Sequence, residues 1–456
     1  MIGFQLSELA RELPAELMGA DAQIQGVSSD SRRLAPGQLF VALKGPRFDG
    51  HDYLDAAAAR GAAGALVSDR PSDALPCLRV ADTRRALGRV AALWRARARA
   101  KVVAVTGSNG KTTVKELLAA ILRRHGPTLA TEGNLNNDIG LPLTLCRLQD
   151  HDYAVVEMGA NHPGEIHYLS TLAQPQVAIL NNAGRAHLEG FGSVAGVARA
   201  KAEILDGLAA GGTFIYNADD PHAPLWRRLA GERTAIGFGS SENAQVRSPA
   251  HALGLHWDEG GFHSEFPVIT PQGSFQVRLA LTGEHNRLNA LAAIAAAQAL
   301  GVPQETILAG LAEVKPVAGR LCPRMAPGGV RLVDDSYNAN PDSVCSALEV
   351  LCQAPGRRLL ALGDLGELGE QSARLHAEIG ERARARGVDL LFTCGRSSAA
   401  TSRAFGSGGR HFPEHASLIE ALRAELRPGD TLLVKGSRAA RMEKVVEALM
   451  EEVSPC

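Results

Sequence analysis

The chain has 456 residues, of which 45% are hydrophobic and 21% charged, and its formal net charge is −1. This length exceeds what one hydrophobic core supports, so we expect two or three folded domains. A near-neutral balance excludes a broad basic surface for a polyanion, and the Arg-rich runs 95–101 and 382–386 are typical of solvated helix ends. We therefore expect no nucleic-acid partner.

Cysteine usage and hydropathy argue against a secreted or membrane-spanning protein. Seven cysteines, the last of them Cys456, are dispersed and form no C-x-x-C pair, which is typical of a reducing compartment. The first twenty residues lack the basic and then apolar segments of a signal peptide. The most apolar helix candidate, near 290–302, is too short to span a bilayer. We expect a cytoplasmic protein without a membrane span.

The first region, residues 1–99, mixes short strands with Ala-rich helices. The apolar runs 38–43 and 65–67 predict strands of this region. We expect a small α/β domain here.

The middle region, residues 100–314, repeats an apolar strand, a polar or glycine-rich loop and a helix. This alternation predicts a mostly parallel sheet covered by helices. A less regular, β-like stretch at 245–281 and a helix at 286–300 follow it. The predicted strands of the repeat are 102–105, 153–156, 177–180 and 213–216.

The last region, residues 315–456, predicts a second doubly wound α/β domain. Its first predicted strand is 331–333, and the pattern recurs at 359–362, 390–393 and 431–434. Ligands of such sheets lie beyond the carboxyl ends of the strands, so the loops there are the places to seek chemistry. The predicted fold class is α/β in three domains.

The loop after strand 102–105 carries the strongest functional signal. Small residues let backbone N–H groups face a phosphate, and the following helix adds its positive dipole end. Lys111 would reach the β- and γ-phosphates of a nucleotide, and the Thr112 hydroxyl would hold Mg²⁺. The alternative is an ordinary glycine turn with Lys111 solvated, because Val105 stands where the usual pattern has glycine. The loop residues are Gly107, Ser108, Asn109, Gly110, Lys111, Thr112 and Thr113.

Other polar residues follow the predicted strands or open a helix. Glu157, at a strand end, is either a Mg²⁺ ligand or a surface carboxylate, and His187 is either a metal ligand or a loop histidine. Lys201 stands in an Ala-rich helix, where a lysine is normally solvated. Asn286 and Asn289 lie one turn apart, so they share a face that either reads an adenine edge or caps the helix.

Taken together, these residues resemble the Mur ligases, ATP-dependent ligases of peptidoglycan precursor synthesis. The resemblance spans the whole chain and accounts for Val105, because the loop of this family is shorter. It rests on residues 106–113, Glu157, 182–187, Lys201 and Gly283-x-His285-Asn286-x-x-Asn289.

Further segments are similar to the Mur ligases that join D-alanyl-D-alanine to a UDP-N-acetylmuramoyl tripeptide. The sequence lacks the Asp-Asn-Pro-Arg motif that is usual in the diaminopimelate-adding relatives. The segments are 41–51, 131–144, 186–193, 335–341 and 362–369.

The resemblance implies a small α/β domain for the UDP substrate, a central P-loop ATPase-like domain and a Rossmann-like C-terminal domain. It implies catalytic roles for Lys111, Glu157, His187 and Lys201. It implies ATP contacts by the phosphate loop with Asn286, Asn289, Arg320 and Asp335. Two Mg²⁺ sites would be formed by Thr112, Glu157, His187 and a carbamylated Lys201.

The resemblance also implies substrate-binding residues. Without it, Arg320 is a surface arginine, and the Ser, Asp and Asn residues are turn and capping residues. The implied substrate residues are Ser29, Asp30, Ser31, Arg32, Asp49 and His51 for the UDP moiety, Asn134, Asn136 and Asn137 for the muramoyl peptide, and Asn338.

The implied reaction passes through an acyl phosphate that the amine of D-alanyl-D-alanine attacks, in a monomer whose last domain moves to close the site. Three other functions stay open from the residues alone: a nucleotide-driven switch or hydrolase, a non-catalytic nucleotide-binding partner, and a folate polyglutamylating ligase. The third residue of the tripeptide, diaminopimelate or lysine, is also open.

Overall fold

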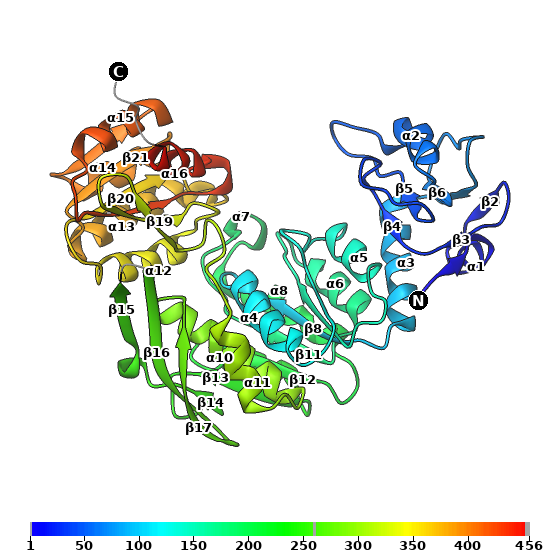
Figure 1. The fold of residues 1–456 in the computed structure, drawn as a ribbon, viewed down its shortest axis with the longest axis horizontal. Helices are drawn as coiled ribbons and strands as arrows, with labels where there is room; N and C mark the ends of the chain where they lie inside the picture. Colours follow the sequence, from blue (N-terminus) through cyan, green and yellow to red (C-terminus); the bar gives the residue numbers. More distant parts are fainter. Residues whose placement is uncertain (1, 259–260, 452–456) are drawn as a thin grey trace.

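The computed structural model describes residues 2–258 and 261–451, and these form three α/β units in chain order (Figure 1). Cys456 lies outside the described residues. The six described cysteines are free thiols, as their dispersed spacing predicts. In the described part of the chain, no helix has the length and apolarity that a bilayer crossing requires.

The first unit contains a five-stranded sheet in the order β2-β7-β6-β5-β4 and a separate pair of β1 with β3. The predicted strands 38–43 and 65–67 are confirmed as β5 and β6, whose residues are all buried. The elements are β1 (Phe4–Gln5), α1 (Leu6–Glu12), β2 (Glu16–Met18), β3 (Gln23–Ile24), β4 (Val27–Ser28), β5 (Leu39–Val41), η1 (Gly50–Tyr53), α2 (Leu54–Ala59), β6 (Gly64–Val67) and β7 (Cys77–Arg79).

Helix α3 (Thr83–Arg97) joins the first unit to the second (Figure 1). It packs against α5 and α6 of the middle unit, and its residues belong to a core that both units share. The Trp94 side chain is fully buried, and its Nε1 donates to the Leu148 carbonyl at 2.8 Å. The packing of this helix therefore fixes the position of the first unit relative to the second.

The middle unit is built on a sheet in the order β15-β16-β14-β13-β12-β11-β8-β10-β9, with β17 beside β16. Strands β8 to β14 pair in parallel, as the repeated strand–loop–helix pattern predicts. The β-like stretch 245–281 contains β15, β16 and β17, and these pair antiparallel, an orientation that the sequence pattern did not indicate. The strands are β8 (Lys101–Thr106), β9 (Thr128–Ala130), β10 (Tyr153–Glu157), β11 (Val177–Leu180), β12 (Thr213–Asn217), β13 (Thr234–Gly239), β14 (Val246–Arg247), β15 (Gly254–Asp258), β16 (Gly261–Thr270) and β17 (Gly273–Leu279).

The Ala-rich helix α10 packs on α4 next to this sheet, and its alanines are buried, because small side chains allow close approach. The helices of the unit are α4 (Lys111–Arg123), α5 (Gly140–Leu145), α6 (Glu165–Ala173), α7 (Leu188–Phe191), α8 (Val194–Ala202), η2 (Glu203–Gly207), α9 (Ala223–Ala230), η3 (Ala250–Ala252), α10 (Glu284–Ala299) and α11 (Gln304–Ala312).

The last unit has a six-stranded sheet in the order β18-β19-β23-β20-β21-β22. Its elements are β18 (Cys322–Ala326), β19 (Val330–Asp335), α12 (Pro341–Leu351), β20 (Arg358–Gly363), η4 (Gly369–Gln371), α13 (Ser372–Ala385), β21 (Leu390–Cys394), α14 (Ala399–Phe405), β22 (Gly409–Phe412), α15 (His415–Glu425), β23 (Thr431–Lys435), η5 (Arg438–Ala440) and α16 (Glu443–Met450).

The prediction that 331–333 is the first strand of this unit is wrong. It lies within β19, and β18 precedes it as an antiparallel edge strand. β18 contains a proline and exposed residues, so it lacks the apolar run of a central strand. The sequence patterns also missed β22, an edge strand without buried residues.

Candidate functional site

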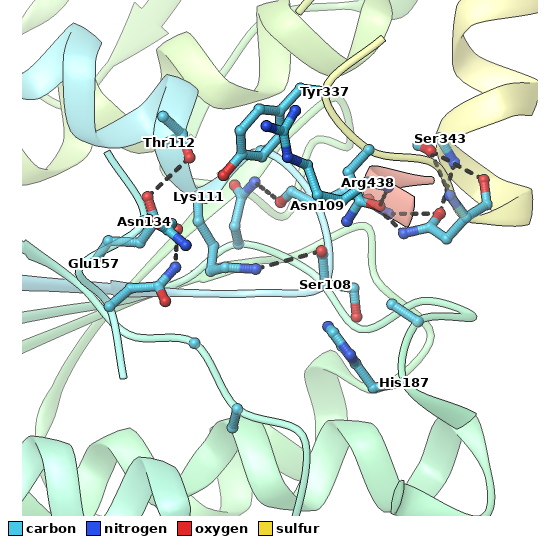
Figure 2. Close-up of a pocket in the computed structure, with 18 of the residues that line it drawn as sticks. Ser108, Asn109, Lys111, Thr112, Asn134, Glu157, His187, Tyr337, Ser343 and Arg438 are labelled. Carbon is cyan, nitrogen blue, oxygen red and sulfur yellow. Dashed lines mark hydrogen bonds between the residues drawn. The ribbon is translucent and has the colours of Figure 1, made fainter. Parts of the chain in front are cut away.

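A cavity of about 1370 Å³ is lined by residues of the middle and last units. It lies at the carboxyl ends of β8, β10 and β11, where parallel sheets place their ligand sites. Figure 2 shows its phosphate-loop residues facing Tyr337 and Ser343 of the last unit. The predicted site residues that line it are Ser108, Asn109, Gly110, Lys111, Thr112, Thr113, Asn134, Asn136, Asn137, Glu157, His187, Asn286, Asn289, Arg320, Asp335 and Asn338.

The phosphate loop turns sharply between β8 and the N-terminus of α4. Gly110 has φ +79°, and a Cβ there would lie 2.3 Å from Asn289 Oδ1, so a larger residue does not fit. Lys111 Nζ donates to the Gly107 carbonyl at 2.7 Å, and burial lowers its pKa. The loop therefore has a phosphate cradle's form: the N-terminus of a helix lies beside a half-buried lysine that a phosphate would stabilise in its charged form.

The two predicted asparagines of α10 share a face, and they tie the helix to the phosphate loop. Asn289 Nδ2 donates to Asn286 Oδ1 at 3.0 Å, while Asn286 Nδ2 donates to the Thr282 carbonyl at 2.8 Å. Asn181 Nδ2 donates to both Asn289 Oδ1 and the Asn109 carbonyl. Neither α10 residue caps the helix, which begins after Gly283. Our sequence reading missed Asn181 as a site residue, although it directly follows β11.

Glu157 and Thr112 meet at the floor of the cavity. Thr112 Oγ1 donates to Glu157 Oε2 at 2.8 Å (Figure 2). Asn136 Nδ2 donates to Glu157 Oε1 at 2.8 Å. Arg320 Nη2 donates to Thr112 Oγ1 at 3.0 Å. Glu157 is only 3% exposed, so the alternative interpretation of this residue as a surface carboxylate is wrong.

A hydroxyl and a carboxylate oxygen side by side suit Mg²⁺, which prefers hard oxygen ligands and keeps several from phosphate and water. Among the described residues, no three His, Cys, Asp or Glu side chains are grouped as a metal site. The protein therefore offers Thr112 and Glu157 as a partial ligand set. A nucleotide phosphate would have to complete it.

His187 and Lys201 lie on neighbouring segments of the middle unit. His187 precedes α7 with φ +54°, and its Nδ1 pairs with Glu367 of the last unit. Lys201 is fully buried on α8, 5.8 Å from the Phe191 ring centre, and its Nζ has no hydrogen-bond partner among the described residues. Burial, then the charge of Lys111, lowers the pKa of Lys201 to about 7. The expectation of a solvated lysine from its Ala-rich context is wrong.

The last unit contributes an acidic residue held by a lysine. Asp335 Oδ2 accepts from Lys435 Nζ at 2.6 Å, and Oδ1 accepts from the Leu321 amide at 3.1 Å. Burial raises the pKa of Asp335, although Lys435 opposes this. Sequence reasoning missed Lys435, whose position at the end of β23, in register with Asp335 at the end of β19, was the available signal. Asn338 is exposed, and its Oδ1 accepts from the Arg438 amide.

Direct hydrogen bonds join the two units across the cavity. Asn340, which caps α12, donates from Nδ2 to Asn109 Oδ1 of the phosphate loop at 2.8 Å. Arg185 donates to Asp342 at 2.7 Å from Nε and to Glu378 at 2.9 Å from Nη1. The phosphate loop is thus covered by residues that belong to the last unit.

The predicted UDP residues lie in the first unit and do not line this cavity. Ser29 and Ser31 are half-buried beside Asp30, whose carboxylate accepts from Arg32 Nε and Nη2, each at 2.9 Å. Arg32 lowers the pKa of Asp30 to about 2.

The pair of Asp49 and His51 is internal to the first unit. His51 is buried; its Nδ1 lies 2.6 Å from Asp49 Oδ1, and its Nε2 accepts from the Ser68 amide at 3.0 Å. Hydrogen bonds from His51 hold the pKa of Asp49 well below its usual range. His51 thus fastens this loop to the end of β6.

Two predicted site residues of the middle unit, Gly107 and Lys201, also lie outside the lining of the cavity.

Three segments of the sequence, in chain order, match families of Mur ligase domains. Residues 23–105 match the Mur ligase family catalytic domain, residues 105–297 the Mur ligase middle domain, and residues 319–438 the Mur ligase glutamate ligase domain.

Known proteins are similar over nearly the whole chain. The UDP-N-acetylmuramoyl-tripeptide–D-alanyl-D-alanine ligase of Escherichia coli (strain K12) is 49% identical over 455 residues, which cover 99% of each chain. A crystal structure of MurF from Acinetobacter baumannii is 37% identical, with a TM-score of 0.91 and 99% of each chain covered. MurF ligase from Thermotoga maritima, solved with ADP, is 30% identical at a TM-score of 0.83, covering 93% of this chain and 97% of its own. By these similarities, this chain belongs to the Mur ligase family.

Proposed function

We propose that this chain is an ATP-dependent ligase that joins D-alanyl-D-alanine to a UDP-N-acetylmuramoyl tripeptide and so completes a peptidoglycan precursor. The observation that carries the proposal is the meeting of Lys111, Thr112 and Glu157 in a cavity that the last unit covers. The E. coli ligase, 49% identical over the whole chain, is named for this reaction. The ADP complex of the T. maritima relative supports a nucleotide in the corresponding cavity.

In the first step, a carboxylate oxygen of the tripeptide attacks the γ-phosphorus of ATP. The bond from that phosphorus to the bridging oxygen breaks, and ADP leaves with the electron pair. Two anions must approach one another, so the reaction needs positive charge and N–H donors around the phosphates. Lys111, the α4 N-terminus and Arg320 supply them. Mg²⁺ held by Thr112 and Glu157 would neutralise further phosphate charge.

In the second step, the amine of D-alanyl-D-alanine attacks the acyl carbon. The tetrahedral intermediate expels phosphate, the nitrogen loses a proton, and an amide bond remains. Water would destroy the acyl phosphate, so the cavity must exclude it. We propose that the last unit moves to admit substrates and closes for the reaction, because Arg185 and Asn340 join the two units by hydrogen bonds that such a motion can break.

We propose that Lys201 is carbamylated and helps to hold a second Mg²⁺ with His187. A neutral amine attacks carbon dioxide, the new N–C bond carries a carboxylate, and a proton is released. With its pKa lowered to about 7, Lys201 has such an amine at neutral pH. Its unpartnered, fully buried Nζ supports the proposal because a carbamate would bring oxygens to that position.

We propose that residues 1–99 bind the UDP moiety, residues 100–314 bind ATP, and residues 315–456 close the site and receive the dipeptide. In this arrangement Asn134, Asn136 and Asn137 hold the muramoyl peptide, since they line the cavity beside Glu157. ATP lies against Asn286, Asn289 and Asp335. We propose that the enzyme acts as a monomer in the cytoplasm.

The test is phosphate release by the purified protein with ATP, Mg²⁺ and UDP-N-acetylmuramoyl tripeptide, measured with and without D-alanyl-D-alanine. Release that requires both acceptor and UDP substrate, with a UDP-linked pentapeptide as product, supports the proposal. Turnover with a single amino acid would assign a different ligation. Release that needs neither would overturn the proposal in favour of a hydrolase or switch.

A further inference from the structure

An aromatic ring lies beside the arginine that reaches the phosphate loop. The guanidinium carbon of Arg320 is 4.4 Å from the centre of the Tyr337 ring, while its Nη2 donates to Thr112 Oγ1 at 3.0 Å. The guanidinium carbon of Arg438 lies 5.6 Å from the same ring centre. Tyr337 is half-buried and lines the cavity, where Figure 2 shows it with Arg438 above the phosphate loop. The Tyr337 ring therefore makes cation–π contacts with two arginines.

The backbone around Arg320 is fastened to the segment that carries Tyr337. The Tyr337 amide donates to the Gly319 carbonyl at 3.0 Å, and the Leu321 amide donates to Asp335 Oδ1 at 3.1 Å. Leu321 has φ +46°, a left-handed conformation that is costly for a leucine and persists only where its surroundings impose it. A Cβ on Gly319 would lie 3.1 Å from the Cβ of Tyr337. The structure thus fixes both neighbours of Arg320.

Fixing the backbone does not fix the guanidinium, because an arginine side chain has several rotatable bonds. The face of an aromatic ring attracts a cation and restricts the plane in which a guanidinium lies. Catalysis of phosphoryl transfer depends on charge that is already in position when the transition state forms. A ring beside Arg320 supplies that restriction at the point where the side chain enters the cavity.

We propose that Tyr337 is a positioning residue that holds the Arg320 guanidinium toward Thr112 and toward the phosphate that would lie there. The inference rests on the proposed function, since it assigns Arg320 to phosphoryl transfer. The ring and not the hydroxyl is the acting group, because both arginine contacts are made to the ring. The competing role for a cavity tyrosine is a direct contact with the nucleotide base, and the two roles have different kinetic consequences.

The test compares Tyr337→Phe, Tyr337→Leu and wild type in the full ligation reaction, with kcat and the KM for ATP measured separately. Phe keeps the ring, so kcat stays within about twofold of wild type. Leu removes the ring, so kcat falls about 5- to 30-fold while the KM for ATP changes by less than about threefold. Tyr337→Gln replaces Leu if that variant does not fold. Tyr216→Leu is the matched control, since Tyr216 stacks on Phe214 outside the cavity and its loss leaves both constants unchanged.

A double-mutant cycle shows whether Tyr337 acts through Arg320. In an Arg320→Ala background, Tyr337→Leu lowers kcat by less than about twofold, because the group that the ring positions is already gone. Equal effects of Tyr337→Leu in both backgrounds would overturn the inference. So would a raised KM for ATP with unchanged kcat, which is the signature of a contact with the base.

The wild-type enzyme separates this inference from the function on which it rests. If wild type forms no UDP-linked pentapeptide, the proposed function fails. If wild type forms it and Tyr337→Leu is as fast, only the role of Tyr337 fails.

Discussion

Thr112 Oγ1 and Glu157 Oε2 lie 2.8 Å apart, although 45 residues separate them in the chain. Parallel pairing of β8 with β10 brings them together, because Thr112 opens the helix after one strand and Glu157 ends the other. The hydroxyl and carboxylate are thus fixed by the sheet itself. We therefore expect activity to be most sensitive to substitutions that disturb the Mg²⁺ site proposed for these two residues.

Glu157→Gln is expected to lower kcat/KM about 100-fold and to raise the Mg²⁺ concentration required for half-maximal activity. The amide keeps the shape of the side chain and removes the charge that attracts the ion. Activity measured across a Mg²⁺ titration checks this. Glu232→Gln, at an exposed position, is the control and should behave as wild type. An unchanged Mg²⁺ requirement in Glu157→Gln would remove Glu157 from the metal site.

Activation by bicarbonate is expected to depend on pH through Lys201. Its pKa is lowered to about 7, so the reactive neutral amine predominates at pH 8 and the ammonium at pH 6. Enzyme depleted of carbon dioxide should therefore regain activity with bicarbonate faster and further at pH 8. Lys201→Ala should be inactive and regain partial activity with formate or acetate. Failure of every such anion to restore activity would count against the carbamate.

Arg185→Gln is expected to shift the free enzyme toward more open arrangements. Its guanidinium joins Asp342 and Glu378 across the units, and losing these charge-assisted bonds should change the open-to-closed ratio about tenfold. Small-angle scattering should then give a larger radius of gyration. Arg382→Gln is the matched control, because Arg382 pairs with Glu378 within one helix. Superposable profiles of Arg185→Gln, the control and wild type would show that these bonds do not hold the units together.

His51→Leu is expected to lower the free energy of unfolding by about 2 kcal/mol. The substitution leaves the Ser68 amide without its acceptor and Asp49 without its close partner. Denaturant unfolding measures the loss, with the exposed His251→Leu as control. A variant of native stability whose KM for the UDP substrate rises would instead assign His51 to binding.

The strands and the phosphate loop could be predicted because both leave local signals in the sequence. Apolar runs such as Val177–Leu180 coincide with observed strands, since a parallel strand is buried on both faces. The edge strands β18 and β22 gave no such run, because an edge strand need not bury both faces.

The remaining site residues depend on contacts between distant parts of the chain. In the sequence, Lys201 cannot be distinguished from a solvated helix lysine, because its burial depends on how α8 packs. The role proposed for it came only from the family resemblance. Lys435 lies 100 residues from Asp335, and only sheet pairing brings the two together. Asn181 follows a predicted strand and Tyr337 lies in the segment 335–341, but only the folded structure shows that they contact the side chains of Asn289 and Arg320.

The most direct test of the account is the fate of the oxygen atoms of the tripeptide carboxylate. A UDP-N-acetylmuramoyl tripeptide labelled with ¹⁸O in that carboxylate is ligated to D-alanyl-D-alanine, and the released phosphate is analysed by mass spectrometry. An acyl phosphate requires one ¹⁸O to appear in the phosphate, because the attacking oxygen stays on phosphorus when the amine displaces it. Unlabelled phosphate formed alongside the pentapeptide would contradict the proposed mechanism.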